Sequence, residues 1–517
     1  MAYLSLLLGN DIGSRVVNLT LIVCLYPLTK WIYNLYLHPL AKFPGPLLWR
    51  ASRFPAMRAV WGKHFPYEIK KLHAQYGEIV RIAPNELSFA NPDAWDDIYS
   101  MKDGANPEAF KKCELWHGNL EPGPSSVFTT IDFRAHGRIR RFMDPAFSEK
   151  AVLQQEPIVQ SYVSIFIDRI RERSSSSGRT TVNIVEWINF TLIDIIGDLC
   201  FGESFGCLEK CENEPWMDQM AASIKLNYLS INIRHFPIIN NMLKPLAGFL
   251  IPPEIMKQHK DYSDRAKAKL DRRLNSTTAA DRHDVVSQLL KSEDHTEGLT
   301  PDEVLLNTMQ FINAASETTA TVLTGVVNHL LQNSKSLSAL EHEVRQFSSQ
   351  SEMTLSALKQ LPYVNAVLKE GLRMCNPIPI GNMRISPPEG GIVAGNFVPG
   401  NTIVTVLPVA LSFDPKYFHE PEAWRPERWL PEAEADSKSP YYDDHRKAVR
   451  GFGWGPYICI GEPLGWAMMR LFLAKLIFTY DLRKSDTQNN KIVWHEQDTF
   501  AIIIKHRLDV TLVERTG

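Results

Sequence analysis

Apolar residues recur every three to four positions through most of the middle of the chain, and this is the period of a helix. The same period returns directly after Gly461. These patterns predict long helices at Gln155–Arg173, Val182–Phe201, Pro301–Asn333, Leu361–Met374 and Glu462–Tyr480. Helices of this kind bury an apolar face, so the pattern indicates a large helical core.

Shorter runs of β-branched and aromatic residues lie near the two ends of the chain. They predict strands at Ile79–Ile82, Glu86–Ala90, Thr402–Leu407, Phe500–Ile504 and Leu508–Val513. No internal repeat and no convincing linker divides the chain between them. We therefore expect one domain that is mainly α with a smaller β region.

The N-terminal segment has a different pattern. An apolar stretch from Val16 to Leu37 is interrupted by Lys30, whose long side chain can reach the membrane surface. No small-residue cleavage site follows, which disfavours a removed signal peptide. A buried core helix fits poorly with so isolated a position. We expect residues 1–40 to form a short or tilted membrane anchor and residues 41–517 the catalytic domain.

Composition excludes several classes of protein. Among 517 residues, 56 Lys and Arg stand against 58 Asp and Glu, so the net charge of -2 provides no broad positive field for a nucleic acid. Seven cysteines without a CxxC pair argue against a disulfide framework or a zinc module. Chemistry must therefore be sought at individual side chains.

The helix predicted at Pro301–Asn333 carries few charges. Between Thr308 and Leu330 its only ionisable side chains are Glu317 and His329, and a buried carboxylate is costly unless it is paired or functional. The neighbouring Thr318 can bend a helix by bonding to a carbonyl one turn earlier. An acid and a hydroxyl at such a bend can deliver protons into a closed site. From this stretch alone, a satisfied core acid is the more ordinary interpretation.

A second pattern consists of Glu370 and Arg373, three apart and therefore on one face of a predicted helix. Such pairs are usually solvated and contribute little. Arg428, in the Pro- and Trp-rich segment Pro426–Trp429, offers a guanidinium that an ordered loop could bring to Glu370.

The strongest local signal is the loop Phe452–Gly461, in which glycines and a proline surround Cys459. These residue types indicate a rigid loop whose backbone approaches something closely. A helix is predicted directly after it, so Cys459 lies at a helix N-terminus, where free N–H groups favour a thiolate that can ligate iron. The alternative is a buried structural cysteine.

Taken together and in this order, these motifs resemble those of the cytochromes P450, the haem-thiolate monooxygenases, from Phe43 to the end of the chain. The Cys459 loop is similar to the family's haem-binding signature, and Ala314–Thr319 to its oxygen-activation motif. Glu370, Arg373 and Arg428 match its structural triad. The resemblance implies the cytochrome P450 fold and a haem b cofactor.

The resemblance also implies a role for each matching residue. Cys459 would be the axial metal ligand of the haem iron, and Glu317 and Thr318 would relay protons during the activation of O2. The remaining cofactor-binding residues would be three in the cysteine loop and three that face the propionates: Phe452, Gly455, Gly461, His136, Arg140 and Arg384.

Two positions depart from the family pattern. Tyr457 stands where the family usually has a basic residue that pairs with a propionate, so we expect weaker haem retention or a shifted potential unless His136, Arg140 and Arg384 compensate. Ala315 stands where the oxygen motif usually has glycine, and its methyl group would narrow the groove for dioxygen.

Expected partners follow from the same resemblance. The pocket would draw on mainly apolar residues, which predict a lipophilic small-molecule substrate: the loop Trp116–Phe128, Phe311, Ala314, Ile378, Ile380 and Phe500. The segments Tyr33–Leu40 and Arg81–Phe89 look like those of fungal members of secondary metabolism, whose substrates are polyketides, terpenoids or alkaloids.

The chain has no Gly-rich dinucleotide fingerprint, so electrons must come from outside, and the resemblance implies an NADPH–cytochrome P450 reductase at the endoplasmic reticulum, with the catalytic domain in the cytosol. Arg446, Lys447 and Arg450 could form part of its docking face or an ordinary solvated run.

Three functional hypotheses remain. The first is a monooxygenase that inserts one oxygen atom from O2 into a lipophilic molecule by hydroxylation or epoxidation. The second is a haem-thiolate isomerase or dehydratase that uses no external O2, and the third is a non-catalytic haem-binding protein. The presence of both Glu317 and Thr318 favours the first over the second.

Overall fold

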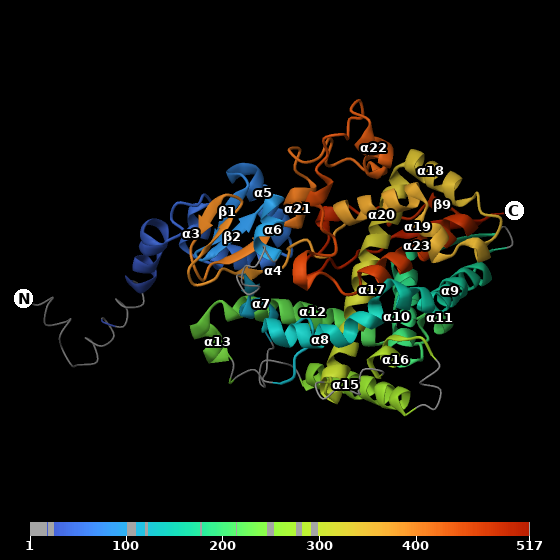
Figure 1. Ribbon diagram of the computed structural model, residues 1–517, viewed down its shortest axis with the longest axis horizontal. Coiled ribbons are helices and arrows are strands. Elements are labelled where there is room, and N and C mark those ends of the chain that lie inside the picture. The colour runs from blue at the N-terminus through green and yellow to red at the C-terminus, as the bar shows by residue number, and fades with distance from the viewer. Residues whose placement is uncertain are drawn as a thin grey trace, which may run out of the picture.

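The computed structural model describes residues 18, 25–100, 110–118, 123–175, 178–212, 215–243, 245, 253–275, 282–290 and 298–515. Helices dominate these residues, and the short strands lie in separate small sheets, one on each side of the helical part (Figure 1). The early helices are a π-helical turn at Tyr33–Leu37 and α3 (Leu47–Ala51), α4 (Phe54–Trp61), α5 (Phe65–Tyr76), α6 (Asp93–Tyr99), α7 (Glu114–His117) and α8 (Phe133–Phe147).

The middle and late parts of the chain supply the longer helices. These are α9 (Glu149–Glu172), α10 (Ile184–Phe201), α11 (Cys207–Lys210), α12 (Pro215–Arg234), α13 (Pro237–Leu243), α15 (Pro253–Leu274), α16 (Val285–Leu290), α17 (Pro301–Gln332), α18 (Ser334–Val344), α19 (Leu355–Lys359), α20 (Pro362–Met374), α21 (Pro408–Ser412), α22 (Pro431–Ala435) and α23 (Glu462–Thr479).

The described strands form three small sheets, two of which join segments that are far apart in the sequence. The largest has the order β1 (Ile79–Ala83), β2 (Glu86–Phe89), β8 (Ile403–Val406), β5 (Arg384–Ile385) and β3 (Lys111–Lys112). A second joins β4 (Arg179–Asn183), β10 (Asp509–Glu514) and β9 (Tyr480–Lys484), and a third pairs β6 (Gly391–Val393) with β7 (Asn396–Val398). The first sheet thus brings Lys112 and Arg384 onto paired strands.

Helix α17 is the central element of the helical part (Figure 1). It begins with a capping box in which the Thr300 hydroxyl accepts from the Glu303 N–H and the Glu303 carboxylate accepts from the Thr300 N–H. Its C-terminal half is buried almost all round, and it packs against α10, α20 and α23. The main apolar core therefore surrounds the helix that carries Glu317 and Thr318.

The long predicted helices are confirmed with small changes at their ends. The largest change is at the first one, α9, which begins at Glu149 and not at Gln155. At the second one, Val182 and Asn183 belong to strand β4 and the helix begins at Ile184. This strand pairs with β10, a partner more than three hundred residues later that local periodicity cannot reveal.

The strand predicted at Phe500–Ile504 is wrong, whereas the other four predicted strands are present as β1, β2, β8 and β10. Its residues fold back on themselves, with a single bridge between Thr499 and Ile503 and a bond from the Ile504 N–H to the Asp498 carbonyl. Because these local bonds satisfy the backbone, the segment has no neighbouring strand among the described residues.

The predicted anchor at residues 1–40 lies mostly outside the described residues. Within them, residues 25–32 are helical and expose large apolar side chains, including Leu25 and Trp31. Among the described helices none is both long enough and apolar enough to span a membrane. From Asn34 onward the chain packs on the first sheet, because the buried Asn34 carbonyl accepts from Arg81.

Candidate functional site

The loop before α23 holds Cys459 through backbone hydrogen bonds. The Cys459 N–H donates to the Phe452 carbonyl at 2.9 Å, and the Ile458 N–H donates to the Gly455 carbonyl at 3.0 Å. Phe452 packs beside Gly465 and Trp466 of α23, with 5.9 Å between the Phe452 and Trp466 rings. These contacts fix the Cys459 backbone one turn before the helix begins.

Gly455 and Gly461 of the loop have different structural roles. Gly455 has a φ of +73°, and a Cβ there would lie 1.9 Å from the Tyr99 carbonyl oxygen, so no other residue fits. Gly461 has a φ of −82°, which any residue can adopt, and a Cβ there would lie 3.8 Å from the Cys459 sulfur. Gly461 therefore leaves room beside the thiol rather than relieving strain.

The Cys459 thiol is subject to opposing influences. Burial raises its pKa, and Glu462 adds to this, while the Gly461 N–H and Arg140 act in the opposite direction. The net direction is upward, although the Cys459 residue itself is exposed to solvent. Iron, which deprotonates a thiol that coordinates it, would supply the missing stabilisation.

A cluster of positive charges lies beside this loop. Lys112 of β3 and Arg384 of β5 are 4% and 3% exposed, and neither has a carboxylate partner among the described residues. Arg140 of α8 donates to the Ile458 carbonyl at 2.5 Å and pairs with the exposed Asp144 at 3.0 Å. Burial, then Arg384 and Arg140, lower the pKa of Lys112 to about 7.

The ring of Tyr457 lies at the centre of this cluster. Its centroid is 4.8 Å from the charged groups of both Lys112 and Arg384, and 4.6 Å from the His136 ring. The aromatic face can attract the two cations by cation–π interaction. Tyr457 therefore contributes to the basic cluster through its ring, although it carries no charge of its own.

The two histidines of the cluster are neutral. Burial, followed by Lys112, Arg140 and Arg384, lowers the pKa of His136 to about 3, and burial followed by Arg384 and Lys112 holds the pKa of His117 well below its usual value. The Arg384 guanidinium donates to Nε2 of His117 at 3.3 Å. The positive charges thus come from Lys112, Arg140 and Arg384, and because Arg140 pairs with Asp144, a dianionic group can neutralise the other two.

Helix α17 contributes the acid and the hydroxyl. The Thr318 hydroxyl donates to the Ala314 carbonyl at 2.5 Å, as predicted, and Ala314 itself is exposed although its helix is central. The Glu317 carboxylate is half-buried and pairs with Lys505. Ala315 packs against the main core, so its methyl group lies on a different face of α17 from the exposed Ala314.

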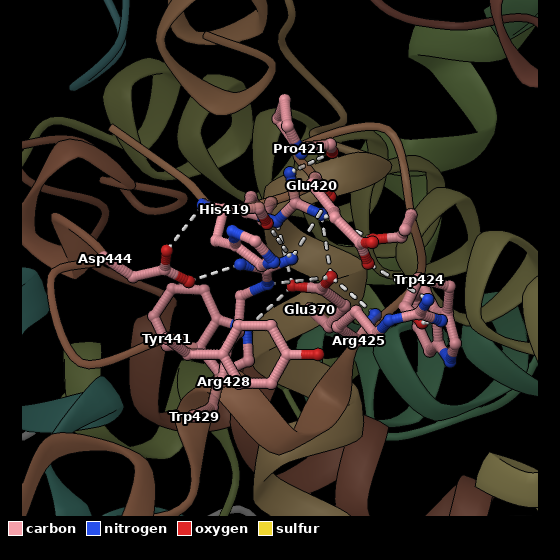
Figure 2. A network of polar contacts seen from close by, with 12 residues as sticks. Glu370, His419, Glu420, Pro421, Trp424, Arg425, Arg428, Trp429, Tyr441 and Asp444 are labelled. Carbon is pink, nitrogen blue, oxygen red and sulfur yellow. Dashed lines mark hydrogen bonds and ion pairs between the residues drawn. The ribbon is translucent and has the colours of Figure 1, made fainter. Parts of the chain in front are cut away.

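The carboxylate of Glu370 lies at the centre of a buried polar network (Figure 2). Both oxygens of Glu370 accept from Arg373, at 2.8 and 2.7 Å, and Arg428 donates to the same carboxylate at 3.3 Å. Trp429 donates to it at 2.8 Å, and Asp444 pairs with Arg428. Burial alone would raise the Glu370 pKa, but these cations and hydrogen bonds hold it below its usual value.

An apolar cluster between the first sheet and α12 brings distant rings together. Trp116 lies edge-on to Tyr228, with 5.6 Å between ring centroids, and Tyr228 lies edge-on to Phe500 at 6.2 Å. Ile380 belongs to the same cluster, whereas Phe311 packs on Phe147 in the main core. The Trp116 indole N–H is buried without an acceptor among the described residues.

Sequence reasoning missed Lys112, His117, Asp444 and Lys505. Lys112 and His117 lie in a short segment with no apolar period or motif, and Asp444 and Lys505 lie in loops. What distinguishes these residues is that they are buried, and burial cannot be predicted from the sequence of an irregular segment. Their placement depends on contacts with residues far along the chain.

The three basic residues before the cysteine loop, Arg446, Lys447 and Arg450, differ in exposure. Arg446 donates to the carbonyls of Arg428, Asp444 and Tyr441, so its guanidinium is occupied within the fold. Arg450 lies over the Trp454 ring at 3.7 Å. Lys447 alone is exposed.

Comparisons with known proteins agree with the resemblance. A family model for cytochrome P450 matches residues 43–507. The cytochrome P450 monooxygenase astA of Talaromyces wortmannii is 36% identical over 504 residues, which are 97% of this chain and 98% of that protein. Averantin hydroxylase of Dothistroma septosporum is 33% identical over 518 residues, 100% of this chain and 94% of that protein.

A solved structure is similar in fold. The crystal structure of the cytochrome P450DA heme domain matches with a TM-score of 0.70 and 16% sequence identity, over 89% of this chain and 94% of that one. At this identity the likeness concerns the arrangement of helices and strands alone.

Proposed function

Because the chain belongs to the cytochrome P450 family, whose members bind haem through a cysteine thiolate, we propose that Cys459 is the axial ligand of its iron. The haem supplies the activation of O2 when it is bound. The observation that supports this assignment most strongly is the basic cluster beside the cysteine loop. Lys112, Arg140 and Arg384 fit the two propionates of haem b, and Lys112 and Arg384 have no described carboxylate partner of their own.

Each remaining residue of the site has a defined role in this proposal. Phe452, Gly455 and Gly461 keep the loop rigid and the space beside the sulfur open. His136, neutral and in contact with Tyr457, can donate one hydrogen bond to a propionate. Thr318 and Glu317 move protons toward the oxygen site. Before this transfer the Thr318 hydroxyl donates its hydrogen bond to the Ala314 carbonyl.

The enzyme is a monooxygenase of lipophilic small molecules, and we infer a step of fungal secondary metabolism. The similar astA is named a monooxygenase and the Dothistroma protein a hydroxylase of averantin, which favours oxygen insertion over the isomerase and the non-catalytic hypotheses. The cluster of Trp116, Tyr228, Ile380 and Phe500 supports an apolar substrate. The unpaired indole N–H of Trp116 would hydrogen-bond one substrate oxygen.

We also propose that residues 1–40 anchor the catalytic domain, residues 41–517, to the endoplasmic reticulum membrane. Large apolar side chains are exposed on residues 25–37 and on three helices that lie at the same end of the molecule, α3, α4 and α13 (Figure 1). Phe54 of α4 lies 5.2 Å from the Phe236 ring, just before α13. Flotation of the full chain with phosphatidylcholine vesicles tests this; a chain that stays with the soluble fraction contradicts it.

Electrons are proposed to come from an NADPH–cytochrome P450 reductase. Helix α8 carries His136 and Arg140 toward the cysteine loop, while Arg134 and Arg141 are exposed on the same helix. We propose that these two arginines and Lys447 form the surface on which the reductase docks. Reduction by the reductase should slow as salt rises, and should slow in Arg134→Glu/Arg141→Glu; equal rates in this variant would exclude the face.

The first test is the carbon monoxide difference spectrum of the reduced protein. A strongly red-shifted Soret band is expected for thiolate-ligated haem, and Cys459→Ala should abolish both this band and turnover. Thr318→Ala should keep the band but reduce the product formed per NADPH by about tenfold or more. Turnover that survives Cys459→Ala would refute the proposed function.

A further inference from the structure

Lys505 is buried and points at the acid of the proposed proton path. Its side chain is 3% exposed, and its ammonium forms an ion pair with Oε2 of Glu317, whose side chain is 15% exposed. The two residues lie 188 positions apart. Within the described part of the chain neither side chain forms another ion pair.

Such a pair is costly to form. Burying a lysine costs several kcal/mol unless a counter-ion compensates, and its long side chain loses about 2 kcal/mol of rotamer freedom on being fixed. The fold therefore contains a costly contact at the one half-buried acid of the C-terminal half of α17. A contact that costs this much and involves a proposed catalytic group is a candidate for a functional role.

The loop that carries Lys505 is well fixed, so its backbone can hold the ammonium in place. The Ile504 N–H donates to the Asp498 carbonyl at 2.8 Å, and the His506 N–H donates to the side-chain oxygen of Gln497 at 2.9 Å. The Thr499 N–H donates to the Lys63 carbonyl at 2.7 Å, which ties the loop to the first helices. Phe500, on the same loop, belongs to the proposed substrate cluster.

We propose that Lys505 is a positioning residue that holds the Glu317 carboxylate in its productive orientation. This inference rests on the proposed proton relay through Glu317. A free glutamate side chain rotates about three torsions, whereas one held by a fixed ammonium keeps its second oxygen in a constant place for proton transfer. Without Lys505, reductant is consumed while less product forms.

Substitution of Lys505 tests the proposal in the reductase-coupled holoenzyme. Lys505→Met should lower the product formed per NADPH about tenfold and lower kcat, with KM within about twofold, because the acid and not substrate binding is disturbed. Lys505→Arg keeps a cation on a long stem and should retain most of the coupling. An unchanged yield in Lys505→Met, with Glu317→Gln uncoupled, would overturn the inference and leave the proposed function intact.

A double variant separates the two proposals. If Lys505 acts through Glu317, Glu317→Gln/Lys505→Met should be no less coupled than Glu317→Gln alone. If Glu317→Gln is itself fully coupled, the proton relay of the proposed function is wrong and the inference falls with it. An additive loss in the double variant would show that Lys505 acts elsewhere, which also overturns the inference.

A control in the same loop distinguishes positioning from loop integrity. Lys63 pairs with Asp498 at 2.6 Å, but both are partly exposed, at 46% and 34%. Lys63→Met should leave the coupling within about twofold of the parent. A comparable uncoupling in Lys63→Met would assign the effect to the loop and refute a specific role for Lys505.

The thermal unfolding midpoint provides a readout that is independent of turnover. Each single variant leaves one buried charge unpaired, whereas the double variant removes both. The midpoint of Glu317→Gln/Lys505→Met should therefore fall by less than the sum of the two single losses. Strict additivity would mean that the ion pair does not form. Should Lys505→Met not yield folded protein, Lys505→Gln replaces it in every comparison.

Discussion

Two groups of buried charges in this molecule differ in whether carboxylates balance them: the cations of both groups have hydrogen-bond acceptors, such as the Val127 and Phe128 carbonyls for Lys112, but only one group has carboxylate partners among the described residues. In the Glu370 network two arginines share two carboxylates, and every guanidinium group has a partner in the protein. In the basic cluster around Tyr457, Lys112 and Arg384 are almost as deeply buried but have no carboxylate among the described residues.

The difference separates a structural element from a binding site. A closed network needs nothing further and fixes the backbone that it bonds, here the carbonyls of Ser412 and Pro421 beside α20. A cluster of buried cations without counter-ions destabilises the folded protein until an anion binds to it. The burial of charge by itself is therefore uninformative, and the presence or absence of a counter-ion indicates the role.

The largest expected effect comes from opening the closed network. Glu370→Gln leaves Arg373 and Arg428 without their shared carboxylate and should cost about 3–5 kcal/mol of folding free energy, with little soluble holoprotein. Glu422→Gln, which breaks an exposed pair with Lys70, is the matched control and should cost less than about 1 kcal/mol. Thermal unfolding measures both; equal losses would remove the distinction between the networks.

The same change in the unbalanced cluster should have the opposite signature. Arg384→Met removes a buried cation without a carboxylate partner, so the haem-free protein should be as stable as the parent or more so. Haem retention should fall about ten- to hundredfold, because a charged hydrogen bond is worth about 1.5–3 kcal/mol. Transfer of haem to an apo-globin measures this, and Arg384→Lys should be intermediate. Unfolding of the haem-free variant as severe as that of Glu370→Gln would contradict the comparison.

A gradual effect, small per pH unit, is expected on the dependence of stability on pH. The pKa of Lys112 is lowered to about 7, first by burial and then by Arg384 and Arg140, so the folded haem-free chain binds fewer protons than the unfolded chain above that pH. Its stability should therefore rise with pH from about 7 toward 10, by at most about 1.4 kcal/mol per pH unit.

Urea unfolding of the haem-free parent and of Lys112→Met at several pH values checks this slope, which the variant should lack. The Glu370 network should respond at the other end of the scale. Its carboxyl has a lowered pKa, so it contributes stability above the usual glutamate range and loses this contribution as the pH falls through the folded value. If Lys112→Met keeps the parent's slope of unfolding free energy against pH, burial of the Lys112 charge does not destabilise the folded chain.

Local patterns in the sequence were sufficient for most of the helices. Apolar period predicted α17, α20 and α23 to within a residue at their starts, because an apolar face must be buried wherever the helix finally packs. The prediction of a strand at Phe500–Ile504 was wrong, because a β-strand forms only where another strand is available to pair with it. Its residues form a turned loop, and the identity of a partner strand is not written in a local run.

The candidate site divides in the same way. Cys459, Glu317, Thr318 and the Glu370–Arg373 pair were found from the sequence, since each belongs to a short motif whose residue types limit its chemistry. Lys112 and Lys505 could not be found, because each is an ordinary lysine until the fold buries it beside a residue far along the chain.

The sequence by itself therefore determined the helical framework and the chemical groups that short motifs carry. The tertiary structure alone decided which charges meet: that Asp444 completes the pairing of Arg428, that Lys505 holds Glu317, and that Lys112 and Arg384 face Tyr457 without a carboxylate. The physical reason is that helix formation depends on neighbours within a turn or two, whereas the energy of a buried charge depends on what the folded chain places within a few ångströms of it.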